Sequence, residues 1–80
     1  MDKDEAEHVH FVELAGADAR ERLSTQAALW RDQGVHTTLL RSADDDGLWL
    51  LVGRAATTPP PADVSGARTW RFVSAPGVRS

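Results

Sequence analysis

The chain has 80 residues, enough for one small domain, and no cysteine, which excludes a disulfide framework and a thiolate metal site. The first seven residues carry four of its twelve acidic side chains and one of its nine basic ones. The other residues are therefore neutral overall, which gives no electrostatic reason to expect a nucleic-acid partner. No apolar run could span a bilayer, and the acidic start is unlike a secretory signal. We therefore expect a cytoplasmic protein with no membrane partner.

A strand and then a helix are predicted for the first half of the chain. Residues 8–14 are rich in β-branched and aromatic side chains and stop at Gly16, which is typical of a strand. A helix is predicted between Asp18, an N-cap with Glu21 three residues later, and Gly34 in a left-handed conformation. Apolar side chains recur at helical spacing on one face of this segment, namely Ala19, Leu23, Ala27 and Trp30.

Two further strands are predicted in the middle of the chain. Residues 35–41 and 48–54 have strand-like composition, and the polar segment 42–47 between them ends in a glycine. Such a segment is typical of a hairpin connection. The sequence therefore predicts two neighbouring antiparallel strands.

The last part of the chain is predicted to contain a stiff loop and one more strand. Residues 55–67 include three consecutive prolines and show no helical period, whereas residues 69–73 have strand-like composition. The order β-α-β-β-loop-β indicates a ferredoxin-like α+β fold, with a four-stranded, mainly antiparallel sheet and a proline-rich loop in place of the second helix. The third strand is expected between the first and the second.

This α+β domain is expected to cover residues 8–75. Residues 1–7 are expected to form a flexible acidic arm, and residues 76–80 a loose tail. The chain shows no internal repeat.

Both faces of the predicted sheet are apolar. In residues 48–54, Trp49 and Leu51 point to one side, while Leu48, Leu50 and Val52 point to the other. One helix covers only one face, and the remaining patch would exceed what a monomer usually exposes. We therefore expect a homodimer paired face to face, with Trp49 and Leu51 in the dimer face. The alternative is that the loop 55–67 folds back over the second face.

The stretch from Gln26 to Val52 resembles the antibiotic-biosynthesis-monooxygenase family of dimeric α+β barrels. A helix ends in a glycine turn, and a strand and hairpin follow with the residues Leu39-Leu40-Arg41-Ser42-Ala43-Asp44 and Leu48-Trp49-Leu50-Leu51-Val52. The resemblance implies a dimeric α+β barrel, and the family includes quinol-type oxygenases and haem-degrading enzymes. Its catalytic members keep key polar or haem-ligating residues on the second helix. Residues 55–67 replace that helix and contain no His, Asn, Tyr or Trp, so no catalytic residue is carried over.

We therefore expect a binding or accessory role without a cofactor, rather than catalysis. One alternative is a cofactor-independent oxygenase or isomerase acting on a small aromatic substrate, with His36 as its proton-transferring group. A second alternative is a module that pairs its sheet with a different protein.

A small apolar or aromatic ligand would be expected between the helix and the sheet. Trp30 with Trp49 or Trp70 would line that space, and Arg71 or His36 would be its polar anchor. The competing interpretation is that these aromatic side chains only fill a small core.

Two clusters have some of the character of metal sites. His8 and His10 lie on one side of a strand, and a third ligand would have to come from His36 or Glu13. The aspartates at 44–46 lack the glutamate that closes a calcium loop. Because neither cluster completes a coordination shell, we expect no bound metal.

Overall fold

The structure is a computed structural model that describes residues 7–74; the predicted tail at 76–80, and the predicted arm apart from Glu7, lie outside the described residues. Its elements in chain order are β1 (His8–Ala15), α1 (Ala19–Asp32), β2 (His36–Arg41), β3 (Leu48–Ala55) and β4 (Arg68–Val73). No helix in this described part is long and apolar enough to cross a membrane.

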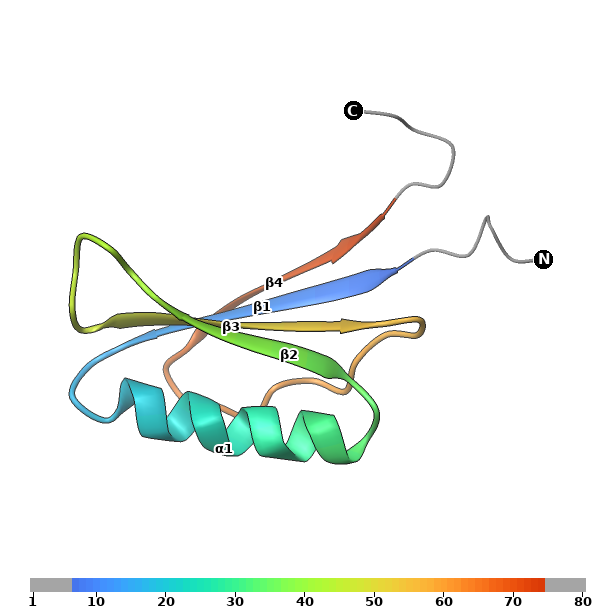
Figure 1. Ribbon diagram of the computed structural model, residues 1–80, viewed down its shortest axis with the longest axis horizontal. Coiled ribbons are helices and arrows are strands. Elements are labelled where there is room, and N and C mark those ends of the chain that lie inside the picture. The colour runs from blue at the N-terminus through green and yellow to red at the C-terminus, as the bar shows by residue number, and fades with distance from the viewer. Residues whose placement is uncertain (1–6, 75–80) are drawn as a thin grey trace.

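The four strands form one antiparallel sheet in the order β2-β3-β1-β4 (Figure 1). β3 lies between β1 and β2, as the connectivity predicted. This is a ferredoxin-like α+β arrangement with one helix, and the predicted fold class is confirmed.

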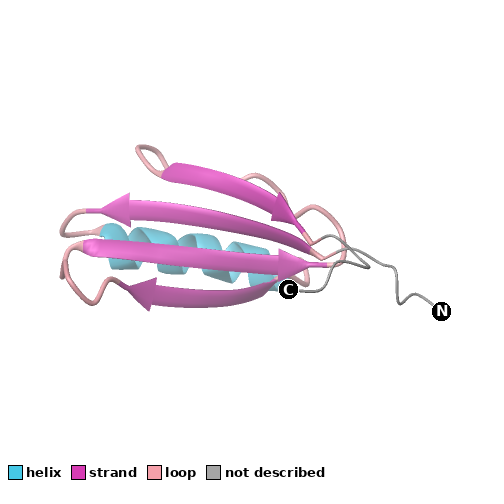
Figure 2. Ribbon diagram, turned by 90° about the horizontal axis from the view of Figure 1, so that it is seen from above, coloured by secondary structure: helices cyan, strands magenta, loops and turns pink. Residues whose placement is uncertain are grey.

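α1 packs along one face of the sheet, which we call the covered face (Figures 1 and 2). The apolar stripe of the helix is the part that is buried, as its spacing predicted. The core between helix and sheet consists of Val12, Leu14, Ala19, Leu23, Ala27, Trp30, Val35 and Leu51.

The two ends of α1 differ in how well they match their sequence signals. Gly34 follows the helix with φ of +84°, the left-handed conformation predicted for it. Asp18 precedes the helix, but its side chain forms no capping hydrogen bond, so the predicted capping box is wrong. Its φ of −103° and ψ of 11° place it outside the extended region in which an N-cap oxygen reaches back to the first turn.

The loop of residues 56–67 lies on the helix side of the sheet, where a second helix would lie in the complete fold (Figure 1). Trp30 Nε1–H donates to the Pro60 carbonyl at 2.9 Å, and the Asp63 N–H donates to Gln26 Oε1 at 2.9 Å. Arg22 donates to the Ser65 carbonyl at 2.6 Å. The loop is thus attached to α1, and the alternative in which it covers the opposite face is wrong.

Gly53 permits the close approach of α1 to β3. A Cβ at this position would lie 2.5 Å from Cε3 and Cζ3 of Trp30 and 3.1 Å from a methyl of Val35. The missing side chain therefore makes the space that the indole ring occupies.

Candidate functional site

The structure does not bring together the four residues predicted to line a ligand pocket. Trp30 is 1% exposed inside the core, and Trp49 packs beside that core on the covered face. Trp70 lies on the opposite face of the sheet, because it pairs with Phe11 while its neighbour Arg71 pairs with the buried His10. Trp30 and Trp49 thus contribute to the covered side of the fold, and Arg71 alone lines a hollow that is described below.

The residues predicted for the dimer face lie on the covered face. Leu51 is fully buried under α1, and Trp49 contacts the same core. The choice of these two residues is corrected, since alternation alone does not say which face a helix will cover. The apolar face that the helix leaves uncovered carries the alternate residues of β3, Leu48, Leu50 and Val52.

We call this second side of the sheet the open face. Its residues are Val9, Phe11 and Glu13 in β1, His36, Thr38 and Leu40 in β2, Leu48, Leu50, Val52 and Arg54 in β3, and Arg68, Trp70 and Phe72 in β4. Among the described residues, neither the helix nor the loop covers it (Figure 2).

The centre of the open face is apolar. Phe11 lies between Val52 and Trp70 in the strand register, and its ring meets that of Phe72 edge to face at 5.4 Å. Trp70 is 41% exposed, Leu40 47% and Phe72 56%. Large apolar side chains gathered at this density usually mark a contact surface.

The two ends of the open face carry different charged side chains. At one end Glu13 pairs with Arg68 at 3.7 Å. At the other end Arg54 lies beside His36 in the register. The first end therefore offers a carboxylate beside a guanidinium, and the second end offers the guanidinium of Arg54.

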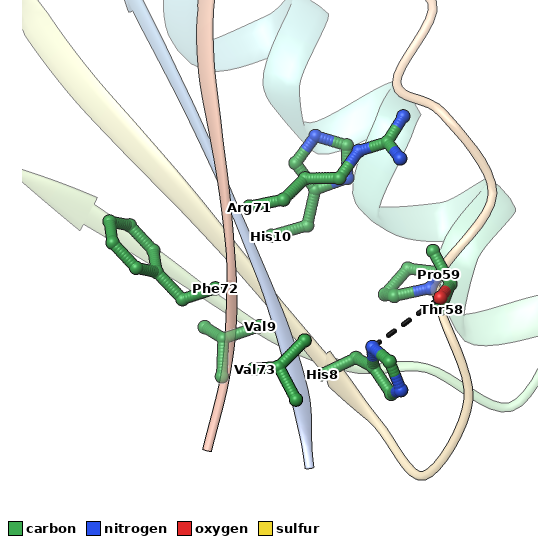
Figure 3. A pocket seen from close by; sticks show the side chains of 8 residues that line it. All are labelled: His8, Val9, His10, Thr58, Pro59, Arg71, Phe72 and Val73. Atoms are coloured by element: carbon green, nitrogen blue, oxygen red, sulfur yellow. Dashed lines mark hydrogen bonds between the residues drawn. The ribbon is translucent and has the colours of Figure 1, made fainter. Parts of the chain in front are cut away.

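A hollow of about 210 Å³ lies where β1 begins and β4 ends (Figure 3). His8, His10 and Arg71 extend to the covered side of the strands, toward the loop residues Thr58 and Pro59. The rest of its lining is formed by Val9, Phe72 and Val73. We call it the β1–β4 pocket.

His10 is the buried polar group of this pocket. It is 2% exposed, its ring lies 5.2 Å from that of Trp30, and its Nδ1 forms no hydrogen bond with any residue between 7 and 74. Burial, and secondly the charge of Arg71, lower the pKa of His10 below its usual value of 6.5. The imidazole is therefore neutral at physiological pH.

This depressed pKa predicts a loss of stability in acid. The unfolded chain takes up a proton that folded His10 resists, so the stabilisation is complete above about pH 6.5 and declines as the pH falls through that value. We expect the urea midpoint to fall less between about pH 7 and pH 5 in His10→Gln than in the wild-type protein. An unchanged dependence in His10→Gln would contradict the assignment.

The residues considered as metal ligands do not assemble into a metal site. His8 and His10 do share a side of β1, but His8 Nδ1 lies 3.4 Å from Thr58 Oγ1. No group of three His, Cys, Asp or Glu side chains suited to a metal occurs within the described chain. In the 42–47 turn, Asp45 Oδ1 accepts a hydrogen bond from the Gly47 N–H at 3.0 Å, so it stabilises the turn.

His36, the group proposed for a catalytic alternative, begins β2 and is exposed. It belongs to the open face and does not line the space between α1 and the sheet. It lines a wide surface hollow with Arg31 and Arg54 instead. No observation joins it to an aromatic pocket.

Comparison with known proteins adds no relative, since no family model, no curated protein and no solved structure matches this chain. The resemblance to the antibiotic-biosynthesis-monooxygenase family therefore stays a prediction.

Proposed function

We propose that the protein is a homodimeric binding or accessory protein whose two copies pair through their open faces. The observation that carries the proposal is the composition of that face, where Phe11, Val52, Trp70 and their apolar neighbours lie together without cover from the described residues. Burying such a face removes apolar surface from water, which is the main favourable contribution to protein association.

The size of the open face suits a second copy of the chain. Four strands about 4.8 Å apart and about six residues long span roughly 400 Å² of flat area, or roughly 800 Å² for two copies. Because side chains project from the sheet, the accessible area buried in the dimer exceeds this flat area. It approaches the roughly 1,000 Å² of total buried area that specific protein–protein interfaces need. Sheets also stack readily on one another through apolar faces.

The charges at the two ends of the open face favour a particular pairing. A two-fold axis across the strands turns one copy end for end, because such an axis reverses the strand direction. Glu13 of one copy then lies near Arg54 of the other, and this happens twice in the dimer. Opposite charges at the rim of an apolar interface fix orientation more than they add affinity.

Charge placed in the open face should separate the copies. We expect the wild-type protein to sediment as a dimer at micromolar concentration, and Phe11→Glu to sediment as a monomer, because a carboxylate buried without a partner costs several kcal/mol. Leu29→Glu, on the exposed side of α1 at 52% exposure, is the matched control and should remain dimeric.

A second variant distinguishes loss of the dimer from unfolding. Trp70 in β4 is 41% exposed, so Trp70→Glu should fold, which circular dichroism can verify. This variant should also sediment as a monomer. A wild-type monomer at these concentrations would contradict the proposal and leave the open face to a different protein. Dimers that persist in both folded open-face variants would place the interface elsewhere.

A further inference from the structure

We propose that the β1–β4 pocket binds a small organic carboxylate, with Arg71 as the contact for the anion. This inference concerns the covered side of the sheet and does not depend on dimerisation through the open face.

Arg71 is placed to receive an anion. It pairs with His10 in the register of β1 and β4, and its side chain extends to the same side of the sheet (Figure 3). Among residues 7–74 it forms no ion pair, and no Asp or Glu of this range lines the pocket. The planar guanidinium offers two parallel N–H donors that match a carboxylate.

His10 supplies a second and independent indication of a ligand. Its Nδ1 is buried and has no hydrogen-bond partner among residues 7–74, and a buried polar group in that condition is unfavourable. The ring lies beside Arg71, whose charge helps to keep the imidazole neutral. A neutral imidazole protonated at Nδ1 donates a hydrogen bond. In the proposed complex the carboxylate accepts hydrogen bonds from the Arg71 guanidinium and from this donor.

The walls of the pocket define the rest of the ligand. Pro59 and Val73 contribute apolar side chains, and the Thr58 hydroxyl lies at the loop side. Val9 and Phe72 border the pocket, but their side chains point to the open face (Figure 3). A volume of about 210 Å³ is below that of pockets for drug-sized ligands. The pocket therefore suits a molecule of about one ring with one carboxylate, whereas an inorganic anion would leave the apolar walls unused.

Nuclear magnetic resonance of the ¹⁵N-labelled full chain tests the proposal with benzoate as the probe. We expect benzoate to cause saturable shifts of the amide signals of residues 8–10 and 71–73. Benzamide, which has the same shape without the charge, and inorganic phosphate, which has charge without the ring, should bind at least about tenfold more weakly.

Matched arginine variants identify the contact. Arg71→Gln should lower the affinity for benzoate at least about tenfold, because it removes a charge-assisted hydrogen bond. Arg68→Gln, in the same strand but on the open face, should bind as the wild type does. The dispersion of the amide spectrum verifies that both variants fold.

Three outcomes would overturn the proposal. These are the absence of saturable shifts at the pocket, equal binding of benzamide and benzoate, and unchanged affinity in Arg71→Gln. Phosphate binding tighter than benzoate would also overturn it, because the site would then recognise an inorganic anion alone.

Discussion

Trp30→Ala is expected to remove a large part of the stability of this protein. Trp30 is the largest fully buried side chain, it contacts the Gly53 side of β3, and it donates the hydrogen bond that holds Pro60. Truncation of a buried tryptophan to alanine costs about 3–5 kcal/mol, and a domain of this size has only about 5–15 kcal/mol in total. Urea unfolding followed by circular dichroism measures the loss.

A conservative variant separates packing from the hydrogen bond. Trp30→Phe keeps an aromatic ring but lacks the indole N–H, so it should lose less stability than Trp30→Ala. Trp30→Phe should also speed amide hydrogen exchange at Asp63 of the attached loop, whose N–H donates to Gln26 Oε1 in α1. If Trp30→Ala were as stable as the wild type to within about 1 kcal/mol, the described core would be wrong.

Gly53→Ala is expected to be destabilising although it adds only one methyl group. The new Cβ would lie 2.5 Å from two ring atoms of Trp30, so the ring or β3 must move. The hydrogen bond from Nε1 to Pro60 resists that movement. Overpacking of this kind costs about 1–3 kcal/mol. Gly47→Ala is a matched control, because the nearest atom to its added Cβ lies at 3.7 Å, and it should be close to neutral.

The clash also predicts coupling between the two positions. Trp30→Leu removes the ring atoms that the methyl group added by Gly53→Ala would strike, so the double variant should lose less free energy than the two single variants together. The difference comes from four urea unfolding curves. Additive losses would show that the methyl group does not meet the ring, which contradicts the described packing.

Much of the fold could be predicted from the sequence because its signals are local. The helical spacing of Ala19, Leu23, Ala27 and Trp30 placed the helix and its buried side, and the glycines at 34 and 47 marked where it and the hairpin turn end. The capping prediction at Asp18 was wrong, because its backbone conformation cannot be deduced from residue type.

The candidate sites were less predictable because they depend on tertiary structure. Alternation in β3 separated Trp49 and Leu51 from Leu48, Leu50 and Val52, but only packing decides which set the helix covers. The proximity of His10 and Arg71 depends on the register of two strands that are far apart in the sequence. The alternation within β1 and within β4 does indicate which side chains share a face of each strand. The register between the two strands, however, is set by the loop of residues 56–67 and its contacts with α1.

Contacts between protons of different copies test most directly whether two copies meet through the open face. Isotope-filtered nuclear Overhauser spectroscopy on a mixture of ¹³C-labelled and unlabelled chains detects only protons of different copies that lie close together. We expect cross-peaks among Phe11, Val52 and Trp70, and none that involve Leu23 or Trp30 inside the covered core. A dimer whose intermolecular cross-peaks came only from the exposed side of α1, or a sample with no such cross-peaks at millimolar concentration, would contradict the claim.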